Sequence, residues 1–308
     1  TTQSDSSEQP RKFRMLNEVY NESEPVELDE DELMLLGVEE PNSFDQAAVD
    51  RAWQKAMEVE INAIERNKTW KLVELPTGHK AIGVKWVYKL KRDANGDVVK
   101  HKARLVAKGY VQKKGVDFEE VYAPVTRLET VKLLLALAAK NQWEVHHMDV
   151  KSAFLNGELQ EIVYVTQPDG FIQEGKEHMV YRLIKALYGL RQAPRAWYAK
   201  LNEYLEELGF VKCPYEYAVY TKREGNEVLI VGVYVDDLLI TGTSIDIISK
   251  FKKQMKEKFE MSDLGKLAYY LGIEVDQQIG FTKLKQAAYA KKLLEKAGLS
   301  SCNAVKYP

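Results

Sequence analysis

The sequence predicts an α+β protein, in which antiparallel hairpins alternate with amphipathic helices. Two hairpin patterns support this fold class. One is an apolar run, residues 228–242, that turns at Asp236-Asp237; the other is a lysine-rich pair of runs that turns at Asn95-Gly96, a strong two-residue turn signal. Apolar residues at helical spacing in 44–67, 130–141 and 194–209 supply the helices. We therefore expect an antiparallel sheet covered by helices.

Composition excludes several protein classes. The 308 residues are 45% hydrophobic and 29% charged with a net charge of −2, as is usual for a globular protein. No apolar run approaches the roughly 20 residues of a membrane span, and no N-terminal signal is present. Cys213 and Cys302 lie far apart without neighbouring His or Cys, which favours a reducing compartment and argues against a disulfide framework or a thiolate metal site.

The first 43 residues are polar and then strongly acidic, so we expect an acidic, disordered linker. Ordered structure is predicted from Ser43, a helix N-cap with Gln46 at the capping-box distance. One amphipathic helix should follow, since apolar residues recur at helical spacing at Trp53, Met57, Ile61 and Ile64.

Residues 78–115 form a basic region, with eleven Lys or Arg against two Asp. Period-two alternation places the cations of each predicted strand on one face and residues such as Trp86 and Leu105 on the other. Such a ribbon can clamp phosphates, whose attraction for Lys and Arg supplies most nucleic-acid affinity that is independent of sequence. It can equally be a solvated, lysine-rich edge that discourages aggregation. The pattern alone leaves both readings open.

A second carboxylate element follows a predicted buried helix, which a capping box at Thr126 and Glu129 introduces. The next short strand has Val145, His147 and Asp149 on one face, and because adjacent strand residues point in opposite directions, His146 and His147 cannot share a metal ion. Further on we expect a helix opened by Pro194 and closed by Gly209, a helix at 245–259, a hairpin at 269–284 and a basic helix at 287–298.

Three carboxylates meet if the strand of Asp149 neighbours the hairpin of Asp236 and Asp237. Like charges a few ångströms apart suppress each other's ionisation unless cations intervene. Mg²⁺ prefers carboxylate and phosphate oxygens, and two such ions can activate a hydroxyl and stabilise a leaving pyrophosphate. The sequence thus predicts a two-metal site.

Several motifs stand here in the order of a known family: AIGVKWVYKLKRD, HKARLVAKGY, MDVKSAFLNGEL, KALYGLRQAPRAWY, YVDDLLITG and YYLGIEV. From about Trp53 to Gly298 the chain resembles the reverse transcriptases of copia-type long-terminal-repeat retrotransposons, as a segment of a Pol polyprotein. The resemblance implies a right-hand polymerase, with fingers and the start of the palm in 44–148, palm in 149–275 and the start of a truncated thumb in 276–308. It also implies RNA- and DNA-templated DNA synthesis by a nucleotidyltransferase.

Residue roles follow from the same resemblance. Asp149 and Asp236 look like the main magnesium ligands, with Asp237 as the supporting carboxylate. Phe154 stands at the position of the aromatic that blocks a ribose 2′-hydroxyl, unless it is simply a core aromatic. Gln192 either lines the nucleotide pocket or supports the core. The implied contacts to the triphosphate are Lys102 and Arg104, and those to nucleic acid are Lys89, Lys91, Tyr234, Leu271, Gly272, Lys291 and Lys292. A solvated helix face is the alternative for the last two. Leu271 and Gly272 resemble part of the strand that holds the primer end.

The implied cofactor is Mg²⁺ as two ions, with Mn²⁺ as a substitute. The implied partners are an RNA or DNA template with its primer, deoxynucleoside triphosphates, and the neighbouring integrase and ribonuclease H regions of the polyprotein, without a membrane. The implied location is cytoplasmic, including retrotransposon virus-like particles. The alternative function is a catalytically silent nucleic-acid-binding module derived from such a polymerase.

Overall fold

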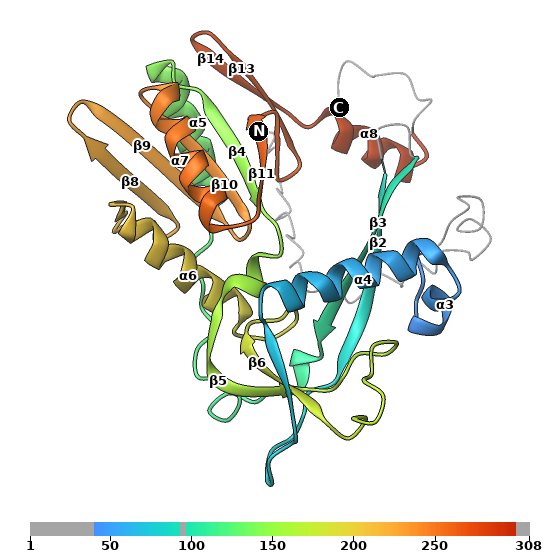
Figure 1. Cartoon of the computed structure of the whole chain (residues 1–308). Helices are drawn as coiled ribbons and strands as arrows, with labels where there is room; N and C mark the ends of the chain where they lie inside the picture. Colours follow the sequence, from blue (N-terminus) through green and yellow to red (C-terminus); the bar gives the residue numbers. More distant parts are fainter. Residues whose placement is uncertain (1–39, 93–96, 300–308) are drawn as a thin grey trace, which may run out of the picture. The chain divides into compact units, whose positions relative to one another are not determined.

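A six-stranded antiparallel sheet is the largest sheet of the computed structural model, which describes residues 40–92 and 97–299 (Figure 1, upper left). The strand order is β11-β4-β10-β9-β8-β7. The bounds are β4 Val145–Val150, β7 Val211–Lys212, β8 Val219–Glu224, β9 Glu227–Tyr234, β10 Asp237–Gly242 and β11 Met261–Lys266. The mixture of helices and antiparallel sheets confirms the α+β class.

Helices cover both faces of this sheet because the strand residues alternate. Leu238 and Ile240 of β10 pack with α6 (Ala193–Glu207) and α7 (Ile245–Lys258), whereas Leu239 packs with α5 (Leu128–Asn141). As predicted, Pro194 lies in the first turn of α6, and Gly209 has a positive φ of 84° just beyond its end. Apolar side chains therefore fill both faces, and β10 is buried along most of its length.

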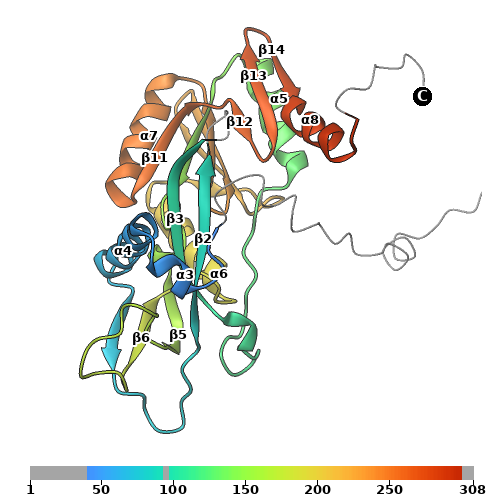
Figure 2. The same ribbon diagram turned by 90° about the vertical axis from the view of Figure 1, so that its right-hand side faces the viewer.

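A second cluster of elements comes from the N-terminal half. The ribbon of β2 (Val84–Arg92) and β3 (Val98–Ala107) lies beside α4 (Arg51–Arg66), as Figure 2 shows. Its apolar face packs on that helix. Trp86, Tyr88 and Leu105 are buried there, so the predicted packing face is confirmed, while the Asn95-Gly96 turn lies outside the described residues. A three-stranded sheet shares this core, with the order β1 (Trp70–Val73), β6 (Val180–Lys185), β5 (Glu158–Val165).

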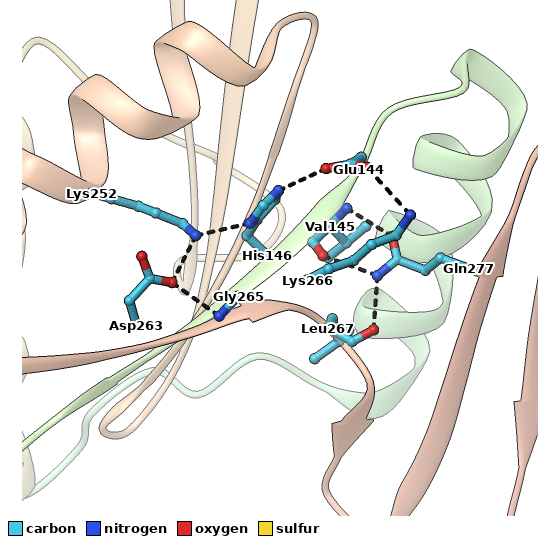
Figure 3. Close-up of polar contacts among 9 residues, drawn as sticks. All are labelled: Glu144, Val145, His146, Lys252, Asp263, Gly265, Lys266, Leu267 and Gln277. Atoms are coloured by element: carbon cyan, nitrogen blue, oxygen red, sulfur yellow. Dashed lines mark hydrogen bonds and ion pairs between the residues drawn. The ribbon is translucent and has the colours of Figure 1, made fainter.

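The C-terminal part forms a small antiparallel sheet, β12 (Tyr269–Tyr270), β13 (Ile273–Gln278) and β14 (Phe281–Lys285), followed by α8 (Ala287–Lys296). The side chain of Gln277 attaches this sheet to β4. Its Oε1 accepts from Val145 N at 2.9 Å, and its Nε2 donates to the carbonyls of Val145 and Leu267 at 3.0 and 2.8 Å (Figure 3). One amide group thus extends the backbone pairing between the two sheets.

Three local predictions are wrong. The helix expected from Ser43 is two helices, α3 (Phe44–Ala48) and α4, because the Asp50 side chain accepts from Ala52 N and caps a new start. The capping box at Thr126 does not form, since its hydroxyl donates to Val233 O at 2.7 Å and α5 begins at Leu128. Leu271 and Gly272, expected in a strand, form the turn between β12 and β13, with positive φ at both residues.

The described elements all belong to one compact unit, Pro41–Pro308. Most of the residues expected to form the acidic linker lie outside the described residues, as does Cys302. Within 40–92 and 97–299, no helix is both long and apolar enough to cross a lipid bilayer.

Candidate functional site

The β9–β10 hairpin has a two-residue loop, Val235 and Asp236, between the paired residues Tyr234 and Asp237. Val235 has a φ of 57°, a conformation that a β-branched side chain rarely adopts. Two hydrogen bonds hold the loop: Trp197 Nε1 donates to Val235 O at 2.6 Å, and Val150 N donates to Asp236 O at 2.8 Å. Strain of this kind persists where the surroundings over-determine the backbone, and it is common at functional sites.

Asp149 of β4 lies directly opposite Asp237 of β10 in the strand register, and Asp236 follows in the adjoining loop. All three side chains are partly exposed. Burial raises the pKa of the Asp149 carboxyl, and the charge of Asp237 raises it further. Burial also raises the pKa of Asp236, with added contributions from Asp237 and Asp149. The sheet therefore brings the three predicted carboxylates into mutual repulsion, a state that a cation would relieve.

His147 contacts the cluster through Asp237. Its Nε2 lies 2.7 Å from Asp237 Oδ1, and since a carboxylate only accepts, the ring donates this hydrogen bond. His146 points to the other face, where its Nδ1 accepts from Lys252 Nζ at 2.8 Å (Figure 3). The two rings thus face opposite sides of β4, as strand alternation predicts. The contact between His147 and Asp237 was not foreseen, because it depends on the pairing of β4 with β10.

Two cations of the ribbon act electrostatically on this cluster. Arg104 lowers the pKa of Asp236, and Lys102 lowers that of Asp149, in each case against the larger effect of burial. Burial lowers the pKa of Lys102 itself, followed by repulsion from Arg104 and Lys91. Lys102 pairs with Lys89 across the ribbon, and Lys91 pairs with Lys100. The polar face of the ribbon thus concentrates positive charge beside the carboxylates.

Phe154 lies on a short 3₁₀ helix, η2 (Ala153–Asn156), just after β4. Its half-buried ring packs against Tyr188, with 4.9 Å between the ring centroids. The guanidinium of Arg104 lies 5.1 Å from the centroid of the same Tyr188 ring. The sequence reasoning missed Tyr188, although it stands inside the quoted KALYGLRQAPRAWY motif.

The remaining predicted residues lie in different settings. Gln192 is buried; it accepts from Gln112 Nε2 at 3.1 Å and donates to Asp117 O at 3.3 Å, which favours its core-supporting alternative. Tyr234 pairs with Asp237, and Leu271 directly follows Tyr270, whose ring lies 6.3 Å from that of Tyr234. Lys291 and Lys292 are exposed on α8, where Lys291 lies 3.8 Å from Glu295.

The carboxylates suit a hard divalent cation in their chemistry, since oxygen ligands are those that Mg²⁺ prefers. In the part of the chain that the structure describes, no group of three or more His, Cys, Asp or Glu side chains is gathered closely enough to hold a metal ion. A bound cation would favour the charged form of each carboxyl, and so would oppose the rise in the pKa of Asp149 and Asp236.

An antiparallel sheet with three carboxylates at one hairpin, beside a basic ribbon, offers oxygen ligands for cations and positive charge for phosphates. A family model described as Reverse transcriptase (RNA-dependent DNA polymerase) matches residues 67–308, and the chain belongs to this family.

Curated relatives agree with the family. The chain is 42% identical over 257 residues to the Retrovirus-related Pol polyprotein from transposon TNT 1-94 of Nicotiana tabacum, covering 82% of this chain and 19% of the relative. It is 38% identical over 270 residues to that from transposon RE1 of Arabidopsis thaliana, covering 87% and 18%. A putative transposon Ty5-1 protein of Saccharomyces cerevisiae is 37% identical over 130 residues, 42% of each chain. The chain thus spans about a fifth of the first two relatives, and the expected copia-type resemblance is confirmed.

Proposed function

We propose that this chain is an RNA- and DNA-templated DNA polymerase, a reverse transcriptase that extends a primer 3′-hydroxyl with deoxynucleoside triphosphates. The observation that carries the proposal is the register of β4 and β10, which sets Asp149 opposite Asp237 and next to the Asp236 loop. The basic face of the ribbon lies within electrostatic reach of these carboxyls. This arrangement supports an enzyme over the alternative, a catalytically silent binding module, because all three carboxylates are present.

In this proposal Asp149 and Asp236 hold Mg²⁺, and Asp237, oriented by His147, supports them. Bound Mg²⁺, as two ions or replaced by Mn²⁺, would supply activation of the primer hydroxyl and neutralisation of the leaving pyrophosphate. The chain's own contribution is to position charge. Lys102 and Arg104 bind the triphosphate, and Phe154 excludes a ribose 2′-hydroxyl. Lys89 and Lys91 contact the nucleic-acid backbone.

The proposed organisation is that of a right hand. The ribbon with α4 serves as the fingers, the six-stranded sheet with its helices as the palm, and the region from residue 276 as the start of the thumb. Tyr234 and the Leu271-Gly272 turn would lie against the primer, and Lys291 and Lys292 against the duplex. Gln192 is proposed to support the nucleotide pocket from the core, since its amide is bonded to Gln112 and Asp117. Integrase and ribonuclease H regions of a parent polyprotein would act beside this segment, in the cytoplasm or in virus-like particles.

The test is deoxynucleotide incorporation on an RNA template with a DNA primer and Mg²⁺. Asp236→Asn should abolish incorporation while leaving the fold intact, and the exposed Asp246→Asn on α7 serves as the matched control. If the wild type incorporates no more than Asp236→Asn but still binds primer and template, the polymerase proposal fails and the silent binding module replaces it.

A further inference from the structure

Tyr188 contacts two residues to which the proposed function gives separate tasks. The first is Phe154, proposed to exclude a ribose 2′-hydroxyl. Its ring packs on the Tyr188 ring with centroids 4.9 Å apart and an interplanar angle of 50°. The second is Arg104, proposed to bind the triphosphate. Its guanidinium lies 5.1 Å from the centroid of the Tyr188 ring, within the range of a cation–π interaction. Phe154 and Arg104 come from different elements, η2 and β3, and this ring contacts both.

The backbone of Tyr188 is fixed to the strand that carries Arg104. Ala107 N donates to Tyr188 O at 2.7 Å. The next residue, Gly189, has a φ of 88°, and a Cβ there would lie 2.2 Å from Ala107 O. A Cβ at Gly109 would likewise lie 2.0 Å from Gly189 O. Only glycine permits so close an approach of two backbones, so the loop that carries Tyr188 is held against the end of β3.

Charged groups of the candidate site also act electrostatically on the Tyr188 side chain. Burial raises the pKa of the Tyr188 hydroxyl to about 12; the charge of Arg104 opposes this, and those of Glu60, Asp236 and Asp149 add to it. The phenol is therefore neutral at physiological pH and brings no negative charge close to an incoming triphosphate. A ring that is anchored by its backbone, neutral and in contact with both groups is suited to setting the spacing between them.

We propose that Tyr188 is a positioning residue that holds the Arg104 guanidinium and the Phe154 ring at a fixed separation, and so couples triphosphate binding to sugar selection. This inference rests on the proposed function. It predicts that one substitution changes two properties together: the affinity for the deoxynucleoside triphosphate and the discrimination against ribonucleotides.

The experiment compares Tyr188→Leu with Tyr188→Phe, which keeps the ring. Tyr204→Leu is the matched control, because Tyr204 has the same two kinds of neighbour: Lys258 Nζ lies 5.0 Å from its centroid, and the Phe259 ring lies 5.5 Å away. Single-nucleotide incorporation on primer and template gives KM and kcat for a deoxynucleotide and for the matching ribonucleotide. Equilibrium binding of a fluorescent deoxynucleotide to the protein with primer and template gives a second readout.

For Tyr188→Leu we expect KM and the nucleotide Kd to rise about tenfold, discrimination against the ribonucleotide to fall about tenfold, and kcat to change less than about threefold. Tyr188→Phe should keep the nucleotide affinity and the discrimination of the wild type, because the ring and not the hydroxyl makes the contacts. Tyr204→Leu should lower only the midpoint of thermal unfolding. Phe154→Ala is the reference for lost discrimination, and Tyr188→Met, closer in volume, takes the place of Tyr188→Leu if that variant does not fold.

The outcomes separate the inference from the function. If the wild type is active and Tyr188→Leu behaves like Tyr204→Leu, or changes KM without changing discrimination, the inference is wrong and the proposed function stands. If the wild type neither binds nor incorporates nucleotides, the proposed function fails and the inference fails with it.

Discussion

His147 and Asp237 show how one hydrogen bond can make two adjacent carboxylates unequal. Asp237 begins β10 and receives the His147 donor at 2.7 Å, while Asp236 lies in the loop before it. The Tyr270 and His147 rings also meet edge to face, with 5.4 Å between their centroids, and this contact restricts rotation of the imidazole. The imidazole therefore fixes one rotamer of Asp237.

Replacing His147 tests this orientation. His147→Leu should lower kcat for incorporation by about tenfold, because residues that orient metal-binding carboxylates typically contribute about 10- to 100-fold. His147→Gln, which keeps a donor, should stay within about threefold of the wild type. Steady-state kinetics at several Mg²⁺ concentrations measure both variants, and equal losses in the two would contradict an orienting hydrogen bond.

Glu60 is a buried carboxyl beneath the ribbon, 7% exposed, which accepts from Leu105 N at 3.3 Å. Burial raises its pKa from 4.5 to about 6, against the opposing effects of that hydrogen bond and of Arg104 and Lys102. The folded protein thus binds this proton more tightly than the unfolded chain does. The resulting stabilisation is fully present below pH 4.5 and is lost as the pH rises through about 6.

Glu60→Gln should therefore be more stable than the wild type at pH 7 to 8, by about 2 kcal/mol, since one pKa unit corresponds to about 1.4 kcal/mol. The difference should vanish below about pH 4.5. Urea unfolding across this range measures the difference in the free energy of unfolding, and the exposed Glu58→Gln on the same helix is the matched control. A constant difference at all pH values would mean that ionisation of Glu60 is not its cause.

At the residue scale, the sequence predicts side chains whose role follows from strand alternation. Asp149 and His147 share a face, and Trp86 and Leu105 pack inward, because period two alone decides these directions. Thr126 and Tyr188 escape prediction for the opposite reason. Their partners, Val233 O and the Arg104 and Phe154 side chains, are distant in sequence, so no local pattern contains them.

At the scale of elements, a polar network joins β4, α7 and β11 (Figure 3). Lys252, 8% exposed, donates to Asp263 Oδ1 and to His146 Nδ1, each at 2.8 Å. Although burial opposes it, hydrogen bonds from Lys252 and from Gly265 N hold the pKa of Asp263 at about 2. The network lies where the pairing of β11 with β4 shifts register, between Asp263 and Gly265, and so secures an irregular strand.

Asp263→Ala should lower the free energy of unfolding by about 3 kcal/mol, because it leaves the buried Lys252 ammonium without its carboxylate. Lys256→Ala removes only the second ion pair of Asp263. Because the Lys256 side chain is 44% exposed, this substitution should lower the free energy of unfolding by less than about 1 kcal/mol. Urea unfolding at pH 7 measures both. Equal effects of the two substitutions would show that burial of Lys252 does not govern the network.

The contribution of Asp263 also has a defined pH dependence. Its folded pKa is depressed, so the stabilisation is present above the ordinary value of 3.8 and is lost as the pH falls toward 2. The difference in the free energy of unfolding between the wild type and Asp263→Ala should therefore become smaller as the pH falls from 3.8 toward 2.

Elements with strong periodicity or turn signals could be predicted, and those made by tertiary pairing could not. The β9–β10 hairpin, α6 and α7 match their expected ranges. β11 has no apolar alternation, since its sequence is MSDLGK, and it becomes a strand because β4 offers a free edge. The break between α3 and α4 was missed because Asp50 was counted as part of the helix and not as a new cap.

At the scale of the whole molecule, positive charge gathers on the ribbon although the net charge is −2. Each phosphate contact made by a lysine contributes roughly one unit to the slope of log Kd against log salt concentration. Replacing Lys89 and Lys91 together with Gln should therefore lower this slope by roughly one to two units for primer and template. Fluorescence anisotropy at several salt concentrations measures it, with Lys253→Gln, exposed on α7, as the control. If the slope of log Kd against log salt concentration does not change, Lys89 and Lys91 do not contact phosphates, and the ribbon is the solvated, lysine-rich edge.

The order of strands in the sheet has a consequence for synthesis of the protein. β4 ends at Val150, yet both of its neighbours, β10 and β11, come from residues 237–242 and 261–266. A ribosome must therefore add about 90 residues after Val150 before the strand of Asp149 can form its first ladder. Until then this strand, whose Val145, Met148 and Val150 are buried in the fold, has two unpaired edges, which are prone to associate with other chains. A nascent chain interrupted before residue 237 would thus be a substrate for chaperones and proteases, and the proposed activity would require translation to the end of β11.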